Sequence, residues 1–269
     1  MNLSVHCVKS ECFPAIKEIG FYGVDLSFDN QKPPEDMLDF AEKALDSGLK
    51  ISQTHLWPPH FRGDKDDFEG FVKEIFPVYK RQIEVSAQIG SPVAVMHPYG
   101  NEDSDLAKKG TVLLIEKLLP TIRKTGIALA VENIYGDKFC RLGFSTAEEL
   151  LYITDYFKGE NIGICFDTGH ALLQGINVTK TLEKIKNRIK ALHIHTTIPI
   201  ADMHSIPYSI KYHESIKWKE FIRILKESEY KGTFNLEIKP PLEYSIPSRN
   251  AFYKMAYEVS KDIIEDRLL

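Results

Sequence analysis

The feature that most constrains the fold is an alternation, from end to end, of eight short β-rich runs with helical patterns. The eight runs are LSVHC (3–7), GVDLSF (23–28), KISQTH (50–55), PVAVMH (92–97), IALAVE (127–132), IGICFD (162–167), KALHIH (190–195) and TFNLEI (233–238). Segments between them carry helix signals; residues 34–48, for example, open with Pro34 and acidic residues and end on Gly48. Such alternation favours βα units and a parallel sheet, and eight units in about 250 residues are typical of a TIM barrel.

The two faces of the predicted strands differ in kind, because alternate side chains point to opposite sides. One face is large and apolar, as in Val24, Leu26 and Phe28, and the other is small or polar, as in Asp25 and Ser27. A doubly wound sheet needs two apolar faces, whereas a barrel packs helices only outside and can hold polar groups inside its mouth. No GxGxxG follows the first strand, which also disfavours a dinucleotide-binding fold. We predict one α/β domain, a (βα)8 TIM barrel over residues 1–269.

Charge and cysteine content exclude several classes of protein. Lys plus Arg number 34 against 38 Asp plus Glu, a net charge of −4, so no global basic field gathers phosphates. No apolar run approaches the roughly 20 residues that span a bilayer, and the N-terminus lacks a signal-peptide pattern. Four scattered cysteines without a CxxC pair favour reduced thiols. We expect a cytoplasmic protein that has no membrane contact.

Six successive predicted strands carry an ionisable or metal-ligating side chain at their last residue or, in the eighth strand, at the residue before it. These strand-end residues are His55, His97, Glu132, Asp167, His195 and Glu237. In a TIM barrel the carboxyl ends of the strands converge at one mouth, where active sites lie. Burying such groups without partners costs several kcal/mol each, and a shared cation removes that cost.

The sequence therefore predicts a divalent-metal site with Glu132, Asp167, His195 and Glu237 as ligands. Three carboxylates and one imidazole suit Mn²⁺, Mg²⁺ or Co²⁺. Further ligand-type residues favour Zn²⁺ and more than one ion: His55, His97, His170, Asp202 and His204. Asp167 has an alternative role as the cap of the turn that follows it.

Other polar residues near the predicted mouth have less defined roles. His193, on the same face as His195, is assigned to substrate binding or to support of a ligand rather than to the metal. Trp57 belongs either to an apolar wall over the substrate or to a surface turn, and the sequence leaves both readings open. Asp25 and His6 are either site residues or polar filling of the barrel, and the sequence leaves both readings open.

The order and strand-end position of several motifs resemble the xylose-isomerase-like TIM-barrel superfamily, which includes sugar-phosphate isomerases, ketose 3-epimerases, inosose-processing enzymes and endonuclease IV. The motifs are GFYGVDLSF (20–28), QTHLW (53–57), VMHP (95–98), AVEN (130–133), CFDTGHA (165–171), LHIHTT (192–197), DMHSIP (202–207) and NLEIKP (235–240). The resemblance implies a metal-dependent sugar or cyclitol isomerase or epimerase. Glu132 and Glu237 would remove and return a proton beside a carbonyl, and His170 would contact substrate. The segment after Glu132 departs from the ketose 3-epimerases, because it lacks their second acidic residue.

Two alternative activities follow from the same resemblance. An endonuclease IV-like zinc-dependent abasic-site phosphodiesterase is one, because all nine ligand types of that trinuclear site have counterparts: His55, His97, Glu132, Asp167, His170, His195, Asp202, His204 and Glu237. Against it, residues 29–33 and 58–66 show no cluster of Arg with intercalating apolar residues. A metal-dependent lyase or dehydratase that uses the same enolate chemistry is the other. We expect a small carbohydrate partner, nucleic acid only in the endonuclease alternative, and a monomer or a homo-oligomer.

Overall fold

The computed structural model describes residues 1–57, 64–136, 142–198, 200–210 and 216–267. Eight parallel strands form one sheet in the order β10-β1-β2-β3-β4-β5-β6-β7. Their bounds are β1 (Leu3–His6), β2 (Gly23–Ser27), β3 (Lys50–His55), β4 (Val93–Met96), β5 (Ala128–Glu132), β6 (Ile162–Asp167), β7 (Ile189–His193) and β10 (Phe234–Leu236). All eight predicted strands are present, and their ends agree with the predicted ends to within two residues.

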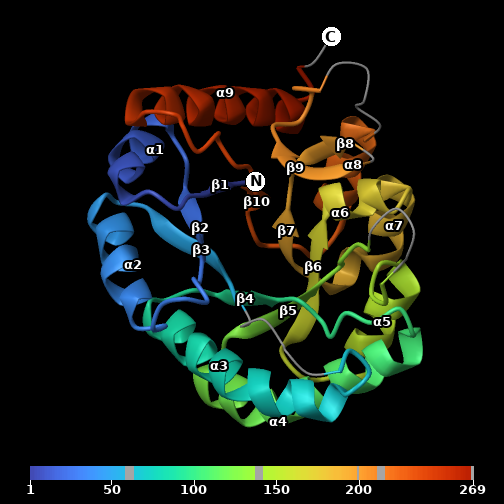
Figure 1. Ribbon diagram of the computed structural model, residues 1–269. Helices are drawn as coiled ribbons and strands as arrows, with labels where there is room; N and C mark the ends of the chain where they lie inside the picture. The colour runs from blue at the N-terminus through green and yellow to red at the C-terminus, as the bar shows by residue number, and fades with distance from the viewer. Residues whose placement is uncertain (58–63, 137–141, 199, 211–215, 268–269) are drawn as a thin grey trace.

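The sheet closes on itself between β7 and β10. Ile194 forms a parallel bridge with Leu236, its N–H donates to the Asn235 carbonyl at 2.8 Å, and its own carbonyl accepts from the Glu237 N–H at 3.2 Å. Figure 1 shows the resulting ring of strands, seen along the barrel axis, with the first and last strands side by side. The predicted (βα)8 TIM barrel is confirmed.

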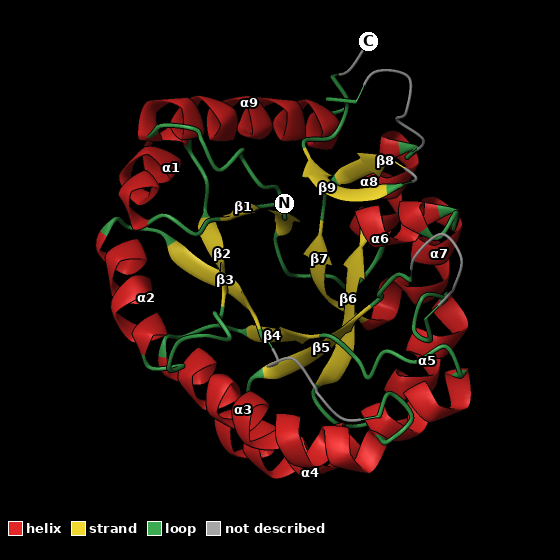
Figure 2. Ribbon diagram, viewed as in Figure 1, coloured by secondary structure: helices red, strands yellow, loops and turns green. Residues whose placement is uncertain are grey.

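Helices surround this ring of strands (Figure 2). Their bounds are α1 (Phe13–Ile19), α2 (Asp36–Asp46), α3 (Phe68–Gln88), α4 (Ser104–Thr125), α5 (Ala147–Tyr156), α6 (Thr168–Leu173), α7 (Val178–Ile185), α8 (Trp218–Glu227) and α9 (Ile246–Glu265). Short 3₁₀ turns cover Ser10–Cys12 and Lys186–Arg188. The helix predicted over 34–48 is α2, and the chain leaves it through Gly48 at φ 80°, a left-handed conformation that glycine adopts without strain.

The two strand faces divide as their composition predicts. The large apolar side chains of the strands, such as Leu26, Leu129 and Phe166, pack against the helices in the main core. The small inward residues of β4 to β7 form a separate cluster inside the barrel: Val93, Val95, Ala128, Ala130, Cys165 and Ala191. Small side chains leave room above them, so ionisable groups can fill the mouth.

The loop that follows β7 differs from the prediction. The strand stops at His193 instead of His195, and the chain then forms an antiparallel hairpin of β8 (Thr196–Ile198) and β9 (Ala201–Ser205). This hairpin contacts α6 at the mouth of the barrel. It brings Asp202 and His204, which the sequence offered as additional ligands, over the carboxyl ends of the strands.

Two of the sequence interpretations use residues that lie outside the described part of the chain. These are residues 58–63, considered for DNA contacts, and residues 137–138 of the segment after Glu132. Among the helices of the described part, none has the length and apolarity that crossing a lipid bilayer requires.

Candidate metal centre at the barrel mouth

Four buried side chains at the carboxyl ends of adjacent strands bring their ligand atoms within 4.8 Å of one another: Glu132, Asp167, His193 and Glu237. Glu132 ends β5, Asp167 ends β6 and His193 ends β7, while Glu237 directly follows β10. Asp167 and His193 are register partners, so they lie at the same height in the barrel. Parallel strands that end together therefore assemble this quartet without help from any loop.

His193 occupies the position that the sequence argument assigned to His195. Its Nδ1 atom lies 3.0 Å from Glu132 Oε1 and 3.0 Å from Glu237 Oε2. His195 is also buried, and its Nε2 atom lies 3.1 Å from both Asp167 carboxylate oxygens. Because β7 ends at His193, this histidine is the register partner of Asp167, while the predicted ligand His195 belongs to two other groups that could hold an ion.

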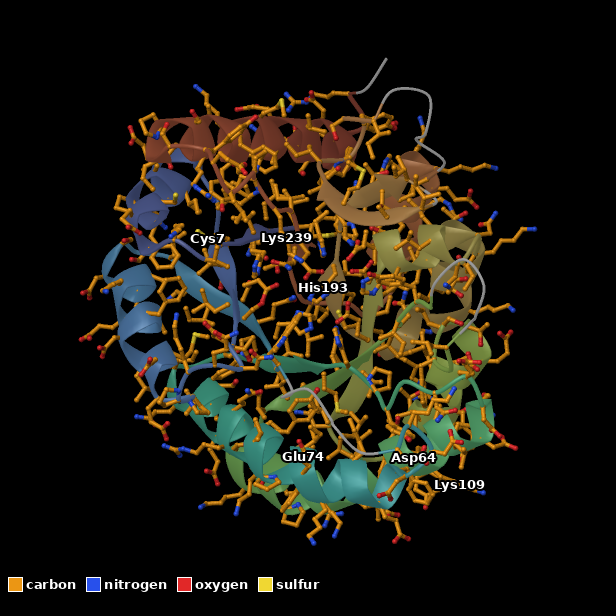
Figure 3. The ribbon with its side chains drawn as sticks, in the orientation of Figure 1. Cys7, Asp64, Glu74, Lys109, His193 and Lys239 are labelled. Carbon is orange, nitrogen blue, oxygen red and sulfur yellow. The ribbon has the colours of Figure 1, made fainter. Side chains whose placement is uncertain are left out.

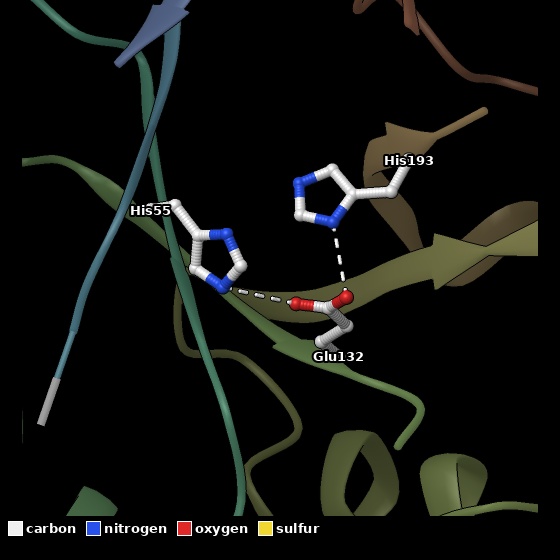
Figure 4. A group of neighbouring side chains, drawn as sticks. All are labelled: His55, Glu132 and His193. Atoms are coloured by element: carbon white, nitrogen blue, oxygen red, sulfur yellow. Dashed lines mark hydrogen bonds and ion pairs between the residues drawn. The ribbon is translucent and has the colours of Figure 1, made fainter. Parts of the chain in front are cut away.

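Glu132 contacts two of the other predicted strand-end residues, His55 and His97. Its Oε2 atom lies 3.2 Å from His55 Nε2 and 3.3 Å from His97 Nε2, while Oε1 faces His193. Figure 4 shows the carboxylate between the rings of His55 and His193. His55 and His97 also contact each other, with 3.1 Å between their Nε2 atoms. The structure thus brings His55, His97 and Glu132 together as expected.

The surroundings of the two glutamates stabilise their charged forms. Burial raises the pKa of Glu132, but its interactions and hydrogen bonds with His193 and His55 hold it well below its ordinary value. Burial also raises the pKa of Glu237. His193 and His204 lower it by more, so the net pKa lies well below its ordinary value. Burial lowers the pKa of His55, so this ring is neutral and has a lone pair available. The site therefore combines ionised carboxylates with at least one imidazole able to act as a ligand.

A second group of ligand-type side chains adjoins the quartet and consists of Asp167, His170, His195, Asp202 and His204. Asp202 Oδ2 lies 2.8 Å from His204 Nε2 and 3.7 Å from His170 Nε2. Burial lowers the pKa of His170, whereas Asp167, Asp202 and Glu132 raise it to about 10. The rings of His195 and His204 stack with centroids 4.5 Å apart. All the strand-end and loop residues predicted as ligands therefore lie in one contiguous cluster.

Three residues that the sequence argument did not single out hold this cluster in place. The Asn133 side chain accepts from the Asp167 N–H at 2.7 Å and donates to the Asp167 carbonyl at 2.9 Å. The Thr168 hydroxyl donates to the His195 carbonyl at 2.7 Å and accepts from its N–H at 3.0 Å. A Cβ on Gly169 would lie 1.8 Å from His195 Cε1, so only glycine leaves space for that ring. Asn133 and Gly169 stand within the AVEN and CFDTGHA motifs, which was the available signal.

Asp167 has both of the roles considered from the sequence. Its side chain caps α6 by accepting from the His170 N–H at 2.7 Å, and its carboxylate also faces His193 and His195. Capping fixes the carboxylate's orientation, so the two roles are compatible.

The mouth contains two hollows, each of about 400 Å³, which share Trp57, Glu237 and Lys239. One also contains His55, His97, His170, Asp202 and His204, and the other extends over His6, Ser27, Phe28 and Asp29. The Trp57 side chain is 38% exposed, and its main chain is fixed by Gln82, which accepts from the Trp57 N–H and donates to its carbonyl. Lys239 Nζ lies 2.6 Å from His204 Nε2. Figure 3 shows Lys239 and His193 near the barrel axis, with Glu74 and Lys109 at the periphery.

The donor set fits a divalent cation. Within the described chain, Glu132 Oε2, Glu237 Oε2, Asp202 Oδ1 and His195 Nδ1 are buried without a hydrogen-bond partner. Buried carboxylate oxygens without a donor are costly, and a cation in contact with them offsets that cost. Among the described residues, the groups able to hold an ion are the quartet and three triads: His55, Glu132 and His193; Asp167, His170 and His195; and His195, His204 and Glu237. Such an ion would act as a Lewis acid toward bound oxygen atoms.

Fold and site together define an α/β-barrel protein with a carboxylate- and histidine-rich centre at the carboxyl ends of its strands. The sequence model of the xylose isomerase-like TIM-barrel family matches residues 13–255. The chain belongs to this family, and the resemblance inferred from its motifs is confirmed.

Individual relatives carry different activities in their names. The chain is 29% identical over 261 residues to an inosose dehydratase of Clostridium botulinum, covering 86% of this chain and 84% of the relative. It is 27% identical over 192 residues to a probable endonuclease 4 of Bacillus subtilis, covering 62% and 63%. A solved structure of a D-psicose 3-epimerase with D-fructose superimposes with a TM-score of 0.77 at 12% identity, covering 98% and 99%, which shows a shared fold.

Three of the curated relatives are matched over only 54–63% of their own length. The chain therefore shares a family with enzymes of several kinds, and the choice among their reactions depends on the site.

Proposed function

We propose that this protein is a divalent-metal-dependent isomerase or epimerase of a sugar or cyclitol, which moves a proton on the carbon beside a carbonyl. The observation that carries the proposal is the pair of buried, ionised glutamates, Glu132 and Glu237, each 3.0 Å from the same nitrogen of His193. Two carboxylates on two sides of one small site can remove a proton from one face of a carbon and return it to the other.

The chain's own residues have distinct tasks in this reaction. Glu132 and Glu237 act as base and acid, and the histidines around Glu132 adjust how readily it takes up a proton. Trp57, with its main chain fixed by Gln82, forms an apolar wall against which a sugar ring can lie. Lys239 and His170 line the same hollow and can donate to hydroxyl or carbonyl oxygens.

A divalent ion held by Glu132, Asp167, His193 and Glu237 would polarise the carbonyl and stabilise negative charge as the proton leaves. Mn²⁺, Co²⁺ and Mg²⁺ suit these mostly oxygen donors. Because the second histidine-rich group adjoins the quartet, Zn²⁺ in more than one position is the alternative occupancy.

Proton transfer beside a carbonyl can be measured directly by solvent deuterium incorporation. Metal-loaded protein is incubated in deuterated water with a panel of free ketoses and inososes, and the recovered compounds are examined by NMR and mass spectrometry. We expect deuterium at one carbon of a panel member, and no incorporation with Glu132→Gln or Glu237→Gln. The matched control is Glu74→Gln, a change at an exposed residue of α3 that should retain full activity. Full activity in either site variant would contradict the assignment of the glutamates.

A dehydratase is the second candidate, and the inosose dehydratase relative favours it because that match covers most of both chains. Proton removal by one glutamate is common to both reactions, and they differ in whether a hydroxyl group leaves. A dehydratase converts the substrate to an unsaturated product with new ultraviolet absorbance, whereas an isomerase or epimerase produces none.

An abasic-site endonuclease is the third candidate, supported by the endonuclease 4 relative and by the nine ligand-type residues in one cluster. The net charge of −4 argues against a partner as negative as DNA. Cleavage of an abasic duplex that falls steeply with salt would favour this alternative over the proposed sugar chemistry.

A further inference from the structure

Asp25 is a buried carboxylate of β2 that lies inside the barrel, outside the candidate ligand set. Its Oδ2 atom accepts from Gln53 Nε2 at 3.2 Å and from Asn235 Nδ2 at 3.1 Å. The other oxygen, Oδ1, has no hydrogen-bond partner among the described residues. A carboxyl group with an unused acceptor, buried in a barrel, needs a further positive or donating neighbour.

The nearest group of that kind is the ring of His193. Its Nε2 atom lies 3.8 Å from Asp25 Oδ2 and is itself buried without a hydrogen-bond partner in the described structure. A buried ring nitrogen without a partner thus lies beside the Asp25 carboxylate, whose other oxygen also lacks a partner. His6 is the other ring near Asp25, with 3.9 Å between Nδ1 and Oδ2.

The orientation of His193 is opposite to that of two other histidines in the cluster. His170 and His204 each direct Nδ1 to a main-chain carbonyl, at 2.8 Å from Asn133 O and 2.9 Å from Glu237 O. Their Nε2 atoms therefore face the site. His193 presents Nδ1 to the site and Nε2 to the barrel interior, where Asp25 takes the place of a carbonyl.

We propose that Asp25 is a positioning residue for the metal centre, which accepts the Nε2 proton of His193 and so holds Nδ1 ready to bind the cation. A neutral imidazole that gives its Nδ1 lone pair to a metal must carry its proton on Nε2. That proton then points at the Asp25 carboxylate, which supplies the partner that the buried Nε2 atom lacks. The inference rests on the proposed function for the presence of the metal.

Asp25 also adds a fourth negative charge close to the three carboxylates of the quartet. In the metal-free protein this charge is unfavourable, because it is buried and lies near Glu237. A bound cation makes the negative charge of Asp25 favourable, because the two charges attract each other. Removing the charge should therefore weaken metal binding while leaving the metal-free fold as stable as before or more stable. A residue that merely fills the barrel would lower stability and leave metal affinity unchanged.

The test is the affinity of metal-free full-length protein for Mn²⁺, measured by calorimetric titration, together with the melting temperature of each metal-free variant. We expect Asp25→Asn, which keeps an oxygen acceptor but no charge, to weaken Mn²⁺ binding about 10-fold, and Asp25→Ala to weaken it about 100-fold. The matched control is Ser4→Ala, which removes the hydroxyl that donates to Asn235 Oδ1 in the same network without touching His193. Its affinity should stay within about two-fold of the unsubstituted protein.

Unchanged affinity in both Asp25 variants would overturn the positioning role while leaving the metal centre intact. Failure of the unsubstituted protein to bind Mn²⁺, Co²⁺ or Zn²⁺ would instead overturn the proposed function, and the positioning role with it. If the Asp25 variants do not fold, a measurement on the unsubstituted protein still tests the proposal. In Zn²⁺-loaded protein with ¹⁵N-labelled histidine, NMR should find the His193 proton on Nε2. A proton on Nδ1 would refute the inference.

Discussion

Gly169 offers a quantitative test of how tightly the histidine cluster is built. In Gly169→Ala the new methyl group would lie 1.8 Å from His195 Cε1 and 2.4 Å from its Nδ1. The ring cannot retreat with its main chain, because Thr168 binds both the N–H and the carbonyl of His195. The imidazole must therefore rotate away from Asp167, and the contact of 3.1 Å between them is lost.

The cost of this change has three parts. Forcing a methyl group into a filled site costs about 1 to 3 kcal/mol. Losing the hydrogen bond of a buried ionised pair costs about 1.5 to 3 kcal/mol. Replacing a helical glycine by alanine returns up to about 1 kcal/mol, since Gly169 lies in α6. The free energy of unfolding should fall by about 2 to 5 kcal/mol, which lowers the melting temperature by at least about 5 °C in a protein of this size.

Calorimetric or circular-dichroism melting of metal-free protein measures this loss, and a double-mutant cycle identifies its cause. In a His195→Ala background the ring is absent, so Gly169→Ala should cost nothing or stabilise slightly. The coupling energy between the two changes should be about 2 to 6 kcal/mol. Effects that add to within about 0.5 kcal/mol would refute the steric account.

Three further outcomes are expected. Glu132→Gln and Glu237→Gln should each lower turnover at least about 100-fold, measured as deuterium incorporation, because each removes one proton-transfer group; turnover equal to that of Glu74→Gln would contradict this. Burial lowers the pKa of His6 to about 3, so below its ordinary pKa the unfolded chain binds a proton that the folded protein does not. The free energy of unfolding should consequently fall as the pH drops from about 6.5 toward 3. In His6→Gln its dependence on pH in this range should be smaller by the contribution of about one proton, as measured by denaturant titration at several pH values. Chelation of a bound metal present at about 100 times its Kd should remove about 2.7 kcal/mol of stability, seen as a melting temperature lower by about 5 to 10 °C; an unchanged melting temperature would mean that no bound ion stabilises the fold.

The sequence determined the barrel well because its signals were local and periodic. Inward and outward residues alternate along each strand, so the small cluster around Ala130 and Cys165 and the outer core around Leu129 and Phe166 follow from strand parity alone. The strand-end positions of His55, Glu132 and Asp167 also followed, since parallel strands of a barrel all end at one mouth.

The site was predicted less completely, because its details depend on where one strand ends. Residues 190–195 continue the alternating pattern beyond His193, but Ile194 pairs with β10 as an isolated bridge and the chain then turns into β8. The alternating pattern does not show where β7 ends. The prediction therefore placed His195 at the level of Asp167, where the structure has His193. The hairpin that delivers Asp202 and His204 forms through contacts with α6, which no local pattern encodes.

The residues that hold the ligand side chains in place were the hardest to predict from the sequence. The side chains of Asn133 and Thr168 and the bare Cα of Gly169 contact residues that lie 25 to 34 positions away in the chain. Asp25 lies 168 positions from His193, and only closure of the barrel brings the two together.

The central claim is that the quartet of Glu132, Asp167, His193 and Glu237 holds a divalent ion. The most direct test is elemental analysis of protein purified without added metal, compared with the Glu237→Gln variant prepared in parallel. The account predicts at least one Mn²⁺, Co²⁺, Mg²⁺ or Zn²⁺ per chain in the unsubstituted protein and a clear loss in the variant. Protein that carries no divalent ion, and takes up none when Mn²⁺, Co²⁺ or Zn²⁺ is supplied, would contradict it.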